Sequence, residues 1–176
     1  MGLLKYYDLN SKEPTRKLHT SDVFLTSVAV SSKGQFVAAG NNNGRLFVVN
    51  EGKKQKMLEL TTHHKLLRDI AFTDDDTKIA TCSDDCSVKL TDISSEKLIT
   101  TLEGHKEGVS SVCAHQDDPS VLFSCSFDKT IRAWDIRKKD CICTNGTGSP
   151  LWTIRSAGRH VLAGGESGIL NVYAWE

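Results

Sequence analysis

The chain has 176 residues, and its 22 basic side chains are matched by 22 acidic ones, so no net charge would draw it to nucleic acid or to an anionic membrane. Apolar residues make up 39% of it, which is ordinary for a globular protein, and none of their runs is long enough to span a bilayer. The N-terminal residues also lack the apolar stretch of a secretory signal, so we expect a protein of the cytoplasm or the nucleus.

Short apolar runs separated by polar turns recur along the whole chain. One register position is held in turn by Tyr7, Val49, Thr91, Trp134 and Tyr173, at spacings of 42, 42, 43 and 39 residues. The strands that this register predicts are, in chain order, 3–9, 15–18, 25–30, 35–40, 45–49, 67–72, 78–83, 88–93, 109–114, 121–126, 131–136, 140–144, 151–155, 161–164 and 169–175. A repeat of this length, built only from short strands, is typical of the four-stranded blades of a β-propeller.

The copy between residues 104 and 145 has the fullest pattern. Gly104-His105 opens it, and Trp134-Asp135 lies on its third strand, where side chains alternate as in a half-buried strand. These motifs resemble the WD-repeat family, and the resemblance covers the whole chain. It implies an all-β, partial propeller: blades at about 20–61, 62–103 and 104–145, a blade end at 1–19 and a partial blade at 146–176.

Three full blades are fewer than most closed propellers contain. We favour the interpretation that the missing blades belong to a longer chain. A second interpretation is self-association, because an unpaired edge strand can template the addition of another strand. The third is a small closed ring in which 15–18 pairs with 169–175, and it would leave 3–9 as a redundant strand.

The resemblance also implies a structural network. In WD repeats a His before the first strand, a Ser or Thr on the second, an Asp in the following turn and a Trp on the third form a hydrogen-bonded set that locks the blade. These roles fall, in that order, on His105, Ser124 or Ser126, Asp128 and Trp134. The preceding copy has His63, Ser83 and Asp85 but carries Thr91 in the Trp position. We therefore expect the blade at 104–145 to be the stiffest.

Catalytic and cofactor motifs are missing from the sequence. It has no phosphate-binding Gly-rich loop and no HExxH motif, and the run 164–168 leads into a strand rather than into the helix of a nucleophile elbow. Of the six cysteines, Cys82, Cys113 and Cys125 lie in apolar runs, and no CxxC pair exists. We predict no enzyme activity, no cofactor and no metal site.

Stacked repeats present an extended surface, so the function expected first is binding to other proteins. In the family, the residue before the turn Asp and the residue that starts the first strand reach the top face of the propeller. The candidates that follow from this are Arg68, Asp84, Phe127, Trp152 and Glu166. Large aromatic side chains at a rim anchor interfaces. For Trp152, core packing beside its apolar neighbours is the alternative. The predicted function is that of a scaffold subunit in a multiprotein complex.

One stretch suggests a particular partner. Residues 122–137 end in Trp-Asp-Ile-Arg and are similar to the box by which WD-repeat substrate receptors dock on the adaptor of cullin-4 ubiquitin ligases. Cys125 and Ala133 depart from that box, and Arg137 is the residue that distinguishes it from an ordinary blade. A role in RNA processing is a further alternative that rests on the habits of the family, since the chain has no RNA-reading motif and we expect no direct contact with nucleic acid.

Overall fold

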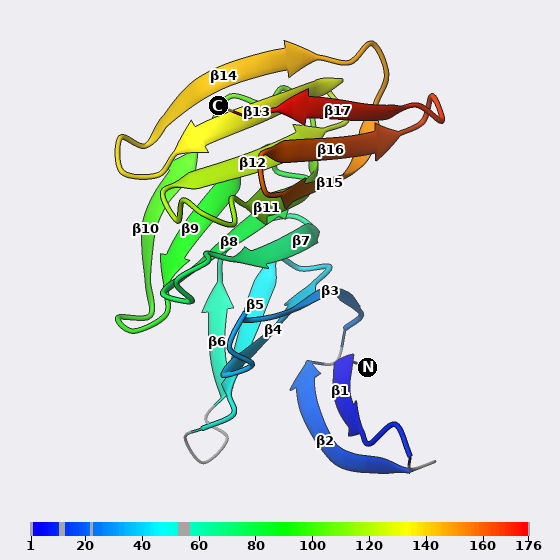
Figure 1. Ribbon diagram of the computed structural model, residues 1–176. Helices are drawn as coiled ribbons and strands as arrows, with labels where there is room; N and C mark the ends of the chain where they lie inside the picture. Colours follow the sequence, from blue (N-terminus) through cyan, green and yellow to red (C-terminus); the bar gives the residue numbers. More distant parts are fainter. Residues whose placement is uncertain (1, 11–12, 22, 53–56, 176) are drawn as a thin grey trace.

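The computed structural model describes residues 2–10, 13–21, 23–52 and 57–175, and these form antiparallel strands in five separate sheets (Figure 1). The N-terminal hairpin consists of β1 (Gly2–Tyr7) and β2 (Pro14–Ser21). The first blade contains β3 (Leu25–Val30), β4 (Phe36–Asn41), β5 (Arg45–Asn50) and β6 (Met57–Thr61). The second contains β7 (Leu67–Phe72), β8 (Lys78–Ser83), β9 (Val88–Asp92) and β10 (Lys97–Leu102). The third contains β11 (Val109–Ala114), β12 (Val121–Ser126), β13 (Thr130–Asp135) and β14 (Asp140–Gly146). The C-terminal sheet contains β15 (Leu151–Ala157), β16 (His160–Gly165) and β17 (Leu170–Ala174).

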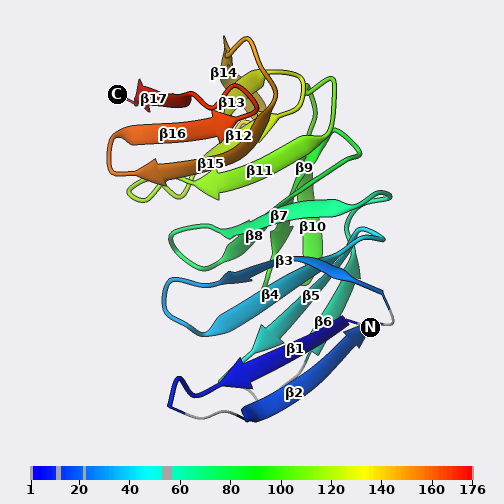
Figure 2. The ribbon, with the colours of Figure 1, turned by 90° about the vertical axis from the view of Figure 1, so that its right-hand side faces the viewer.

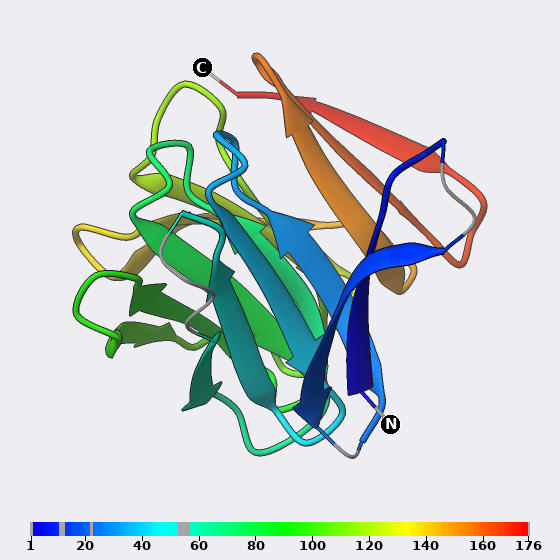
Figure 3. The ribbon, with the colours of Figure 1, turned by 90° about the horizontal axis from the view of Figure 1, so that it is seen from below.

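The sheets follow one another along an open arc. The hairpin lies at one end and the C-terminal sheet at the other, with the three blades between them in chain order (Figures 1 and 2). Seen from below, the hairpin is the part nearest the viewer and the later sheets lie behind it (Figure 3). Within the described residues β2 pairs only with β1, and β17 pairs only with β16. The small closed ring, in which the segments around β2 and β17 pair, is therefore wrong.

The apolar core consists of layers between neighbouring sheets. One cluster lies between the first and second blades, a second between the second and third, and a third between the third blade and the C-terminal sheet. The first strand of each sheet from β3 onward packs against the first strand of the next, so β3, β7, β11 and β15 line the inner side of the arc. No described segment forms a helix that could cross a membrane.

The two faces of strand β13 pack against different neighbouring sheets. Ile131 and Ala133 point into the cluster shared with the C-terminal sheet, whereas Trp134 points into the cluster shared with the second blade. The expectation of a half-buried strand is wrong here, because each face of the strand is covered by a different neighbour. The alternation separates one packed interface from the other.

The prediction of an all-β, partial propeller is confirmed. Each strand range predicted from the register has a counterpart in the structure. The register does not predict residue ranges for the outer strands β6 and β10, although a blade of four strands implies that they exist. Their sequences mix charged and apolar residues without strict alternation, which is why the pattern alone does not mark them.

Candidate protein-interaction face

A chain of hydrogen bonds runs through the third blade from Trp134 to Asp128. Trp134 Nε1 donates to Ser124 Oγ at 2.8 Å, and Ser124 Oγ lies 2.8 Å from His105 Nε2. His105 Nδ1 lies 2.9 Å from Asp128 Oδ2. Because an ionised carboxylate only accepts, Nδ1 must carry a proton, and in the neutral ring Ser124 then donates to Nε2. For a neutral imidazole the direction of every bond is thus determined.

Ser126, the other hydroxyl considered for this network, does not take part in it. Its Oγ donates to the backbone oxygen of Gly108 at 2.9 Å and accepts the backbone N–H of Asp128 at 3.0 Å. It therefore holds the turn after β12 against the segment that leads into β11.

The second blade builds a related network with a different hydroxyl. His63 Nδ1 lies 2.8 Å from Asp85 Oδ2, and His63 Nε2 lies 2.9 Å from Thr81 Oγ1. The assignment of Ser83 to this role is wrong, because its Oγ instead accepts the backbone N–H of Asp85 at 3.1 Å. Thr81 and Ser83 lie two residues apart on β8, so their side chains face the same side of the sheet. The hydroxyl that bonds to His63 is the one at the same height along the strand as the imidazole. The repeat register pairs Thr81 with Ser124 and Ser83 with Ser126, so the sequence offers the same two hydroxyl positions in both blades.

The second blade has no indole to complete its network. Thr91 occupies that position, is only 2% exposed, and its hydroxyl has no hydrogen-bond partner among the described residues. In the first blade the same position holds Val49, which is fully buried. The network of the second blade thus lacks the link between its third strand and its histidine.

The electrostatics of the networks agree with the proton positions. Burial lowers the pKa of His105 and outweighs the opposing effect of Asp128, which favours the neutral ring. Burial acts on Asp128 in the opposite sense, but hydrogen bonds from Thr130, Lys106 and His105 bring the pKa of that carboxyl down to about 2. In the second blade the bonds from His63 and Ser87 outweigh burial and hold the pKa of Asp85 well below its usual range. Both carboxyl groups are ionised at neutral pH.

A β-bulge recurs near the start of every inner strand. The ladder shifts register between Leu25 and Ser27, and the equivalent shift occurs in β7, β11 and β15. The residues at the four bulges are Thr26, Arg68, Ser110 and Trp152. A bulge re-aims a side chain away from the alternation of its strand, which explains why these positions differ from their neighbours in what they contact.

Two of the bulge residues tie neighbouring sheets together. Thr26 Oγ1 donates to the backbone oxygen of Leu67 at 2.5 Å, and Ser110 Oγ donates to that of Leu151 at 2.7 Å. Each bond joins one inner strand to the next. The other two bulge residues, Arg68 and Trp152, carry large side chains that are free to reach the surface.

Arg68 forms a cluster with Asp84 and Phe127. Its Nε and Nη2 donate to the two carboxylate oxygens of Asp84 at 2.7 and 2.9 Å, and its guanidinium carbon lies 5.1 Å from the centre of the Phe127 ring. Gly108, which no sequence motif marks, makes this contact possible. A Cβ there would lie 2.7 Å from Asp84 Oδ1 and 3.4 Å from the Phe127 ring. The second and third blades therefore meet closely at this cluster.

Trp152 and Glu166 extend the candidate face onto the C-terminal sheet. Trp152 is 59% exposed, whereas its apolar neighbours Leu151 and Ile154 are fully buried. The core-packing alternative for Trp152 is thus wrong. Glu166 is exposed in the turn between β16 and β17, and its backbone N–H donates to the oxygen of Pro150. Within the described part of the chain, no hydrogen bond, ion pair or ring contact joins Trp152 or Glu166 to the Arg68 cluster.

Arg137 lies apart from these residues, just after β13. Its side chain is 72% exposed, and its Nε lies 3.5 Å from Asp135 Oδ1. The carboxylate of Asp135 also accepts the backbone N–H groups of Arg137 and Lys138, so it orders the turn. The guanidinium is available to a partner.

The cysteines offer little chemistry in the described residues. All six are free thiols, and burial raises the pKa of Cys113 and of Cys125 to about 12, so neither is a thiolate at neutral pH. No group of three or more His, Cys, Asp or Glu side chains in the described ranges is arranged to hold a metal ion.

Comparison with known proteins agrees with this architecture. The family model described as "WD domain, G-beta repeat" matches residues 12–50, 54–92 and 96–135. The chain belongs to the WD-repeat family. Each match begins ahead of the first strand of a blade and ends on its third, so the WD repeat is offset from the structural blade by one strand.

Two curated WD-repeat relatives show the range of similarity. Nuclear distribution protein PAC1 of Candida albicans is 32% identical over 131 residues, which cover 71% of this chain and 26% of the relative. Target of rapamycin complex subunit wat1 of Schizosaccharomyces pombe is 26% identical over 98% of this chain and 55% of its own length. The chain thus spans between about a quarter and about half of these relatives.

Two solved structures share the fold at low sequence identity. The structure of U3-55K superposes with a TM-score of 0.81 at 15% identity, and covers 89% of this chain and 50% of its own. The WD40 repeats of RRP9 superpose with a TM-score of 0.80 at 15% identity, over 88% of this chain and 49% of their own. At this identity the likeness concerns the fold alone.

Proposed function

We propose that this WD-repeat chain is a non-enzymatic scaffold subunit that holds one protein beside another in a cytoplasmic or nuclear complex. The observation that carries the proposal is the exposed Trp152, which a bulge turns away from the core, on the same sheet end as the Arg68 cluster. The name of one relative, a Target of rapamycin complex subunit, is consistent with work inside a complex.

The chemistry of this face suits a protein surface. Trp, Phe and Arg side chains dominate the binding energy of many interfaces, because they bury much area and lose little conformational entropy. Arg68 is already held by Asp84 and stacked on Phe127, so little ordering remains to be done when a partner binds. The hydrogen bond to Asp84 raises the pKa of Arg68, and its charge persists at any physiological pH.

The test compares variants of the interaction face, which we define as Arg68, Asp84, Phe127, Trp152 and Glu166. Affinity purification with quantitative mass spectrometry should show partners of the wild type reduced by about tenfold or more in the double variant Phe127→Ala/Trp152→Ala. The matched control is Leu98→Ser, which removes an exposed apolar side chain from the outer strand β10. Equal recovery of every partner by the double variant would contradict the proposal.

A docking role towards the cullin-4 adaptor is a second candidate, favoured by the exposure of Arg137 at the end of the Trp-Asp-Ile-Arg run. A guanidinium can bind an acceptor with two parallel bonds, which Lys cannot do. Arg137→Lys should therefore weaken co-purification with the adaptor while unfolding stays unchanged, because an exposed ion pair contributes little stability. Equal adaptor recovery by the wild type and this variant would remove the candidate.

RNA processing is the remaining alternative. Its test is retention on RNA at increasing salt concentration, since contacts with phosphates weaken steeply as salt rises. The absence of any salt-sensitive retention would exclude direct RNA binding and leave a protein-binding role.

A further inference from the structure

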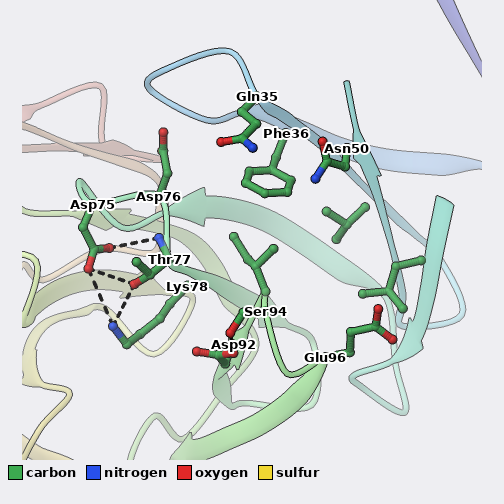
Figure 4. Close-up of a pocket in the computed structure, with 13 residues that line it drawn as sticks. Gln35, Phe36, Asn50, Asp75, Asp76, Thr77, Lys78, Asp92, Ser94 and Glu96 are labelled. Carbon is green, nitrogen blue, oxygen red and sulfur yellow. Dashed lines mark hydrogen bonds and ion pairs between the residues drawn. The ribbon is translucent and has the colours of Figure 1, made fainter. Parts of the chain in front are cut away.

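A cavity of about 750 Å³ opens between the first and second blades (Figure 4). Its wall includes the turn between β7 and β8 and the turn between β9 and β10. Asp84 lies in the turn between β8 and β9, and in antiparallel strands successive turns lie at opposite ends of the sheet. The cavity is therefore at the end of the blades opposite to the interaction face, and it shares no residue with that face.

The floor of the cavity is apolar. Phe36, Val48 and Leu58 come from the first blade, and Ile93 comes from the second. The ring of Phe36 points into the open space in Figure 4. The same ring stacks on Phe72 at 6.5 Å between ring centres. The size is in the range of ligand-binding clefts, and the floor could take one or two apolar side chains.

The rim of the cavity is acidic. Among the described residues, the charged side chains that line it are Asp75, Asp76, Asp92, Glu96 and Lys78. Hydrogen bonds from the backbone of Ser95 and from the hydroxyls of Ser94 and Ser95 lower the pKa of Asp92 to about 2. For Asp75, hydrogen bonds from Thr73 and Thr77 outweigh burial and also lower the pKa. Figure 4 shows Asp75 beside Lys78 on one side of the cavity and Glu96 on the other.

A fourth carboxylate at the cavity, that of Asp76, accepts hydrogen bonds that link the two blades. It accepts the backbone N–H of Ser32 at 2.8 Å, that of Lys33 at 3.0 Å and the hydroxyl of Ser32 at 3.0 Å. These bonds fasten the β7–β8 turn to the β3–β4 turn of the first blade. The acidic rim is thus built on a fixed frame that spans both blades.

We propose that this cavity binds a short basic segment of a partner protein, with an apolar side chain seated on the Phe36 floor and flanking Arg or Lys side chains on the acidic rim. The occupant follows from charge complementarity: among the described lining residues negative charge exceeds positive charge, which disfavours phosphate-bearing ligands such as nucleic acid and anionic lipid. The apolar floor disfavours a free polyamine, which has nothing to bury there. The chain would then contact partners at both ends of its blades.

The experiment measures the affinity of fluorescently labelled synthetic peptides by anisotropy. The probe has a central Leu flanked by Arg residues, and the two comparison peptides replace Arg by Glu or Leu by Ser. We expect the Arg–Leu probe to bind at least about tenfold more tightly than either comparison, and its affinity to fall as salt rises. The variant Asp92→Asn/Glu96→Gln should weaken the probe about five- to tenfold, because it removes two rim charges and keeps the side-chain shapes.

Two controls locate the site. Asp117→Asn/Glu103→Gln changes the same number of charges at exposed positions elsewhere and should leave the affinity unchanged. Amide chemical shifts of Phe36 and Ile93 should move on titration. Equal binding of the Arg and Glu peptides, equal binding of spermine alone, no binding by the wild type, or shifts confined to the interaction face would each overturn the proposal. The scaffold proposal would survive all of these outcomes, because its test uses other residues.

Discussion

Replacement of Trp134 tests the hydrogen-bonded network of the third blade most directly. The side chain is 1% exposed and donates to Ser124, so Trp134→Ala should leave a large cavity and cost about 3–5 kcal/mol of unfolding free energy. Trp134→Phe keeps most of the volume and removes the donor, so it should cost less, of which about 1 kcal/mol is the lost hydrogen bond. Since a domain of this kind is stable by only about 5–15 kcal/mol, both losses are measurable.

Urea unfolding followed by far-ultraviolet circular dichroism provides the assay, because Trp fluorescence would change with the variant itself. A cycle of Trp134→Phe with Ser124→Ala should give a coupling energy of at least about 0.5 kcal/mol, since both changes break the same chain of bonds. Trp152→Ala is the matched control and should have a small effect, as that side chain is 59% exposed. The reasoning is refuted if Trp134→Ala costs no more than Trp152→Ala, or if the cycle is additive.

Three further predictions concern the second blade, the effect of pH and the edge of the arc. Thr91→Val removes a buried hydroxyl that has no partner among the described residues, at nearly constant shape, and should stabilise the chain by about 1 kcal/mol in urea unfolding. A loss of stability would show that the hydroxyl is satisfied. Because the pKa of His105 is lowered on folding, the unfolded state binds more protons than the folded state below about pH 6.5, and the free energy of unfolding should fall. The lowered pKa of Asp128 should cause a further fall below about pH 4. Urea midpoints that stay constant from pH 7 to pH 4 would contradict this. Amides of β17 should exchange with solvent faster than those of β12, which has a paired strand on each side; equal protection would indicate that another strand covers β17.

The sequence predicts the register and the main network because both depend on rare residues at fixed spacing. His105 and Trp134 can be aligned with few alternatives, and the turn Asp lies between them. The choice between Thr81 and Ser83 is harder, since both hydroxyls point to the same side of β8 and only their height along the strand differs. The packing of the blade, and not the residue type, decides which of these two hydroxyls meets the imidazole.

The exposure of Trp152 and the acidic cavity lie beyond what the pattern can show. Leu151, Trp152 and Ile154 are all apolar, and only the bulge decides that the middle one faces solvent. The cavity arises where the ends of two blades meet, so its lining comes from positions as distant as Phe36 and Glu96. No local motif marks a surface of that kind.

The layered core also determines the order in which the sheets would unfold. Because each apolar cluster belongs to two adjacent sheets, the free energy of folding is divided into nearest-neighbour terms rather than concentrated in one centre. Loss of one cluster uncouples the sheets on its two sides and leaves the more distant clusters intact. Unfolding of the described sheets should then begin at the hairpin or at the C-terminal sheet, each of which has one neighbour among them, and advance inward one interface at a time.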